Sequence, residues 1–127
     1  MLLEVDGLRV LKGEGPIVML PDGDRAHVDC PKMVDYLLSR THPDGRSKAE
    51  FFTRFGFKVE DWQVLADALK AVGISNPVTA VVQSPHGTRY IVDGRMQSPD
   101  GLTPRVRTVW IVEPGHPGPR LVTAHPL

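Results

Sequence analysis

The sequence has few aromatic residues, a single cysteine and no long apolar run. Phe, Trp and Tyr make up 6% of the 127 residues, so aliphatic side chains must supply most of the core. Cys30 has no second cysteine to pair with, which excludes an internal disulfide and a cysteine-rich zinc site and indicates a reducing compartment. No apolar run approaches a membrane span, and no secretory signal opens the chain. We therefore expect a cytoplasmic protein that does not enter a membrane.

A surplus of positive charge is also missing. Lys and Arg number 15 and Asp and Glu number 15, so the formal net charge is zero, whereas general nucleic-acid binders usually carry a basic surplus. The chain has no Gly-rich phosphate loop, no HExxH, no GxSxG and no paired-cysteine motif, and its five histidines do not show metal-ligand spacing. We expect neither a metal nor another cofactor.

Proline and glycine are abundant instead. There are 12 of each, spread along the chain, which predicts sharp turns between short elements. The length fits one domain over residues 1–127. Within it we expect residues 1–24 to form a strand-and-turn extension and residues 25–127 to hold helices and then a sheet.

The hydrophobic pattern predicts an α+β fold. One helix follows Pro31, a second begins at the capping box of Ser47 and Glu50, and a third runs from about residue 59 to 72. β-Branched runs at 78–83, 88–93, 105–113 and 119–124, joined by turns, predict an antiparallel meander. The expected architecture is N-terminal short strands and about three helices, followed by a four-stranded antiparallel sheet that the helices pack on one face.

Two groups of polar residues lie at element ends or on strands. His42, Arg46 and Lys48 surround the start of the second helix, where free N–H groups and cations suit a phosphate. The alternative is a solvated turn with surface charges. A second group lies on the last two strands and consists of Arg107, Thr108, Arg120, Thr123 and His125. Two arginines on paired strands can hold a phosphate; the alternative is cross-strand pairing and protection of a sheet edge.

Several segments resemble a small bacterial family of uncharacterised domains that occurs as free-standing proteins and as C-terminal domains of polymorphic-toxin-like proteins. The segments are HPxGxxKAxFF from His42, VRTxW from Val106 and PRLVTAxP from Pro119. The arrangement is similar to the barnase–EndoU–colicin–RelE group of metal-independent ribonucleases. The end of the chain also resembles the T-x-Y-P ending of some EndoU-like toxin domains, with His125 where the tyrosine would stand.

The resemblance implies an endoribonuclease-like toxin domain in which a ribose 2′-hydroxyl attacks its own phosphate. One of His42 and His125 would be the general base and the other the general acid. Lys48, Arg107 and Arg120 would stabilise the phosphorane, and Thr123 would bind a phosphate oxygen. Arg46, Tyr90 and Arg120 would bind substrate. The implied partners are RNA and a small antitoxin or immunity protein. The alternative function is a non-catalytic protein-binding or accessory module of the same fold.

Overall fold

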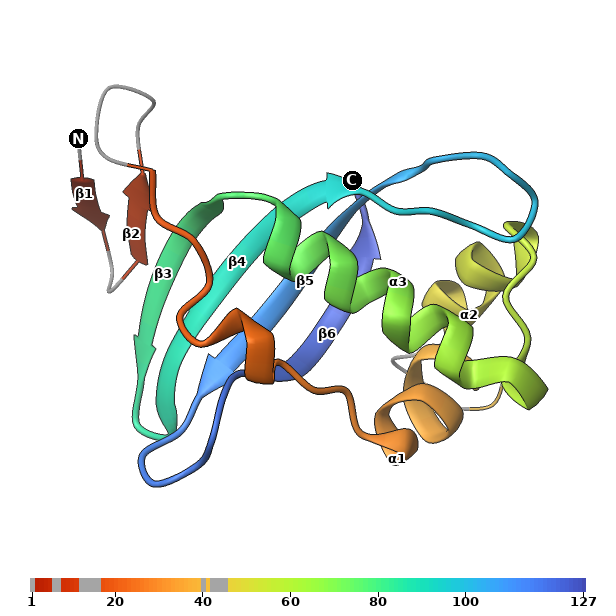
Figure 1. Ribbon diagram of the computed structural model, residues 1–127, viewed down its shortest axis with the longest axis horizontal. Coiled ribbons are helices and arrows are strands. Elements are labelled where there is room, and N and C mark those ends of the chain that lie inside the picture. The colour runs from red at the N-terminus through yellow and green to blue at the C-terminus, as the bar shows by residue number, and fades with distance from the viewer. Residues whose placement is uncertain (1, 6–7, 12–16, 40, 42–45) are drawn as a thin grey trace.

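A computed structural model describes residues 2–5, 8–11, 17–39, 41 and 46–127 (Figure 1). The helical elements precede the main strands, and the order confirms the predicted α+β fold. The helical elements are η1 (Gly23–Arg25), α1 (Cys30–Lys32), the π-helical η2 (Met33–Leu37), α2 (Arg46–Arg54), η3 (Val59–Asp61) and α3 (Trp62–Ser75).

The sheet is antiparallel throughout. Its main part is a meander of β3 (Val78–Ser84), β4 (Gly87–Arg95), β5 (Arg105–Val112) and β6 (Arg120–Pro126). The short strands β1 (Leu2–Val5) and β2 (Leu8–Leu11) form a hairpin that adds to the free edge of β3, so the spatial order is β1 to β6. No helix of the described residues is long and apolar enough to cross a membrane.

The first predicted helix differs from a regular α-helix. Only Cys30–Lys32 is α-helical, and Met33–Leu37 forms a π turn in which the Leu38 amide donates to the Met33 carbonyl at 2.8 Å. The apolar stripe still points inward, because Met33 and Leu37 are fully buried. Single π turns inside helices are uncommon and frequent at functional sites.

The core lies between the helices and one face of the sheet. Alternate residues of β5, including Val106 and Trp110, are buried, and α3 crosses the sheet on that side (Figure 1). A Cβ atom at Gly73 would come within 2.6 Å of the Trp110 ring, so the glycine allows α3 to approach β5 closely. In the described part of the chain, the helices leave the opposite face of the sheet uncovered (Figure 1).

Candidate functional site

The face of the sheet turned away from the helices, which we call the open face, carries a row of polar residues. Thr108 and Trp110 of β5 point into the core, so the alternation of the strand directs Arg107 to the open face. The register places Arg107 opposite Asp93 on β4 and opposite His125 on β6. These three residues therefore lie side by side across three strands.

Asp93 fixes the guanidinium of Arg107. Nε donates to one carboxylate oxygen at 2.8 Å and Nη2 donates to the other at 2.9 Å. The hydrogen bond to Asp93 raises the pKa of Arg107 above its ordinary value. The pair occupies one edge of the guanidinium and leaves Nη1 without a hydrogen bond among the described residues, so this group can still donate to an anion.

His125 contributes a group suited to proton transfer. Its Nδ1 lies 3.1 Å from the Pro126 carbonyl oxygen. A carbonyl only accepts, so Nδ1 is the donor in this contact, and the neutral ring then carries its lone pair on Nε2. The half-buried imidazole can take a proton at Nε2.

Thr123 connects this row to the helices. It lies two residues before His125 and pairs in register with Val109, at the outer strand of the sheet. Its Oγ1 lies 3.4 Å from the hydroxyl of Tyr36 in the π turn. Lys48 of α2 places its Nζ 5.2 Å from the centroid of the same tyrosine ring, within the range of a cation–π interaction.

Arg120 lies on β6, the strand of Thr123 and His125, but its guanidinium is bound to Glu113, away from these two residues. Its Nε and Nη2 both donate to one oxygen of Glu113, at 3.1 and 3.0 Å. The hydrogen bond from Arg120 lowers the pKa of Glu113. Arg120 pairs in register with Ile111, at the other end of β5 from Arg107.

The structure does not bring all the predicted residues together. Thr123, His125 and Arg107 are neighbours, and Lys48 reaches them through Tyr36. Arg46 is exposed at the start of α2, 3.6 Å from Glu50, and Tyr90 packs against the core on the helix side. His42 lies outside the described residues.

Two residues of this arrangement escaped the sequence reasoning. Tyr36 lies in the segment that carries the apolar stripe of the first helix, so its pattern indicates a core residue. Asp93 is an ordinary strand carboxylate until the register of β4 and β5 is known. The sequence signal that could have found Asp93 is its negative charge on the predicted strand next to that of Arg107.

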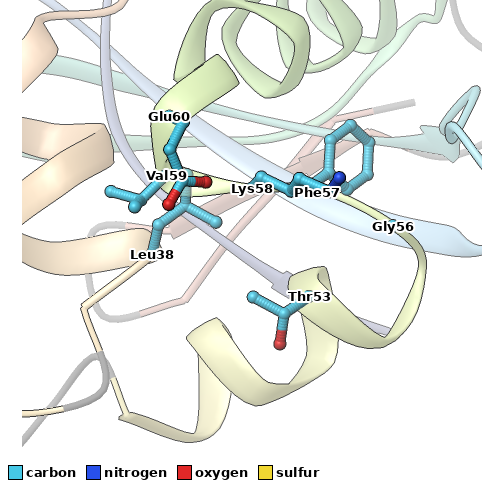
Figure 2. A pocket seen from close by; sticks show the side chains of 7 residues that line it. All are labelled: Leu38, Thr53, Gly56, Phe57, Lys58, Val59 and Glu60. Atoms are coloured by element: carbon cyan, nitrogen blue, oxygen red, sulfur yellow. The ribbon is translucent and has the colours of Figure 1, made fainter.

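A pocket of about 380 Å³ lies in the helical layer, where the end of η2 meets α2 and η3 (Figure 2). None of the predicted site residues that the structure describes lines it. Its walls are Leu38, Thr53, Gly56, Phe57, Lys58, Val59 and Glu60. Among the described residues, no group of three His, Cys, Asp or Glu side chains gathers in a way that could hold a metal ion.

Comparisons with known proteins match both the sequence and the fold. The model of a domain of unknown function, DUF6883, matches residues 19–127. No curated protein matches the chain. A chain of the "Contact-dependent growth inhibition toxin - immunity protein complex from Klebsiella pneumoniae 342" is similar in structure, with a TM-score of 0.63 and 19% sequence identity. The match covers 83% of this chain and 96% of that chain, and at this identity it shows a shared fold.

Proposed function

We propose, from the premise that the chain belongs to the DUF6883 family of domains of unknown function, that it is a toxin-type endoribonuclease domain that cleaves RNA without a metal. The observation that carries the proposal is that α2 and the π turn meet β6, the strand at the edge of the sheet, beside the polar row of the open face. There His125 lies opposite Arg107 in register, Thr123 lies two residues before His125 on the same strand, and Tyr36 joins Thr123 to Lys48.

Each group has a role in 2′-hydroxyl attack on phosphorus. The new bond joins O2′ to phosphorus and the bond from phosphorus to O5′ breaks, which leaves a 2′,3′-cyclic phosphate and a 5′-hydroxyl. His125 takes the 2′-hydroxyl proton at Nε2, and His42 is the candidate for the acid that protonates O5′. Arg107 and Lys48 stabilise the charge that develops on the phosphoryl oxygens, and Thr123 donates a hydrogen bond to one of them.

The shared fold supports this proposal. The similar solved chain comes from a complex of a contact-dependent growth inhibition toxin with its immunity protein. By that likeness the expected partner of this chain, besides RNA, is a small antitoxin or immunity protein.

The test is cleavage of RNA by the purified protein in the presence of a chelator. The wild type is expected to give products that end in a 2′,3′-cyclic phosphate. His125→Ala removes a proton carrier and is expected to lower kcat by about 10²–10⁴-fold. Arg107→Ala and Lys48→Ala are expected to lower kcat as well, because each removes a charge that stabilises the transition state.

Arg105 provides a matched control, since it is an exposed arginine on the same strand, two residues before Arg107. Arg105→Ala is expected to leave kcat unchanged. Intact RNA after incubation with folded wild-type protein would contradict the proposal, as would equal losses in Arg105→Ala and Arg107→Ala.

A second candidate is a non-catalytic protein-binding module. The observation that favours it is that Arg107 and Arg120 are each already paired with a carboxylate of the same chain. Such pairing satisfies the guanidinium without a substrate. A wild type that leaves RNA intact but captures a small acidic protein, with loss of capture in Arg120→Ala, would favour this candidate over the ribonuclease.

A further inference from the structure

One arginine of the open face differs from its neighbours. Arg107 and Arg120 are each held by a carboxylate, at Asp93 and Glu113. Arg89 on β4 has a buried Nε with no hydrogen-bond partner in the part of the chain that the structure describes. A buried donor on a charged group that lacks an acceptor is costly, so this N–H calls for an explanation.

The register places Arg89 beside Arg120. Both pair with Ile111 of β5, Arg89 from β4 and Arg120 from β6, so Arg89, Ile111 and Arg120 form a second row across the open face. Ile111 is only 3% exposed, although it is not part of the core cluster on the helix side. The aliphatic stems of the two flanking arginines are long enough to cover it.

Two arginines that flank one apolar residue can together bind an anion. Glu113 occupies Nε and Nη2 of Arg120, so Nη1 of Arg120 remains a donor without a partner among the described residues. Planar donors of arginine match phosphate and carboxylate oxygens. A ligand oxygen that displaced the groups covering the Arg89 Nε would give this N–H its missing acceptor.

We infer that Arg89 and Arg120 form a binding site for a phosphodiester group of the RNA strand, separate from the phosphate that is cleaved. The inference rests on the proposed function. The row of Arg89 and Arg120 lies on the same face as the row of Arg107 and His125. The two rows cross β5 at Ile111 and Arg107, four residues apart, which is roughly 14 Å at the rise of an extended strand. An RNA strand carries phosphates all along its length, so one strand can occupy both rows, which a single phosphate cannot.

The experiment measures binding of a short all-deoxy oligonucleotide, which lacks the attacking 2′-hydroxyl, over a series of salt concentrations. Arg89→Met keeps the stem over Ile111 and removes the charged donors. It is expected to weaken binding of the oligonucleotide roughly tenfold and to reduce the slope of log K against log salt by about 0.7. Arg89→Lys is expected to retain the slope.

Arg54 in the last turn of α2 is an exposed arginine on the helical layer and provides the control. The inference would be overturned if wild type and Arg89→Met gave the same slope of log K against log salt. It would also be overturned if Arg54→Met weakened oligonucleotide binding as much as Arg89→Met, or if the wild type did not bind the oligonucleotide. Selective loss of binding to poly-glutamate would overturn it in favour of an acidic protein ligand. If the wild type cleaves RNA and Arg89→Met binds the oligonucleotide normally, the binding site at Arg89 is wrong and the proposed ribonuclease function stands. If binding depends on Arg89 but the wild type does not cleave RNA, the ribonuclease function is wrong and the binding site stands.

Discussion

At the scale of single residues, the hydroxyl of Thr108 links two strands in the core. It is fully buried, donates to the Val92 carbonyl at 2.8 Å and accepts from Trp110 Nε1 at 2.8 Å. Thr108→Val keeps the shape and removes both bonds, which leaves the indole N–H buried without an acceptor. We expect a loss of about 1–3 kcal/mol in the free energy of unfolding, measured by urea denaturation.

Thr108→Ser is the matched control, because serine keeps the hydroxyl and removes one methyl group. That change is expected to cost about 0.8 kcal/mol. A Thr108→Val protein at least as stable as Thr108→Ser would contradict the role given to the hydroxyl.

The sequence could predict which strand residues face outward but not which residues they pair with. Alternation along β5 separates Arg107 from Thr108 and Trp110, and the structure has them on opposite faces. The partnership of Arg107 with Asp93 depends on the register across the connection of residues 96–104, and no local pattern fixes it. The same holds for Tyr36, whose hydroxyl meets Thr123 from a distant part of the chain.

At the scale of elements, the ion pair of Arg120 and Glu113 joins β6 to the end of β5. The hydrogen bond from Arg120 lowers the pKa of Glu113, so the folded protein holds this carboxylate in its charged form more strongly than the unfolded chain does. The stabilisation is complete above the ordinary glutamate pKa of about 4.3 and is lost as the pH falls through the lowered value. Both side chains are partly exposed, so salt is expected to weaken the pair.

Glu113→Gln tests this link between stability and pH. The variant is expected to melt at a lower temperature than the wild type at neutral pH, and the difference is expected to vanish in acid once Glu113 is protonated. Thermal unfolding across an acid titration measures it. A difference that persists unchanged in acid would show that the substitution acts through packing rather than through charge.

Turn and capping residues in the sequence predicted where the helices and strands lie. Hydrophobic periodicity did not predict which kind of helix forms. The capping box places a helix start at Ser47, and α2 begins at Arg46. The turn at 84–87 separates β3 from β4 as expected. The π turn of Met33–Leu37 was missed, because an apolar stripe at helical spacing reads the same whether a turn closes on the fourth or the fifth residue.

At the scale of the whole molecule, the β1–β2 hairpin lies outside the family domain. The DUF6883 match begins at residue 19, so the matched residues do not include the hairpin. The hairpin instead pairs β2 with the edge of β3, through Leu8 to Val10 and Ala80 to Val82. We infer that the core folds without it and that its contribution is to cover the backbone of an edge strand.

Deletion of residues 1–16 tests that role. The shortened protein is expected to unfold cooperatively, because it keeps every residue that the family model matches. It is also expected to associate as its concentration rises, because the edge of β3 now offers unpaired N–H and C=O groups to a second copy. Sedimentation over a range of concentrations measures the association. Val82→Lys in the shortened protein places a charge on that edge and is expected to restore the monomer, since edge lysines oppose strand pairing. Loss of cooperative unfolding on deletion would instead mean that the hairpin belongs to the folding unit, and that the unit is larger than the family match.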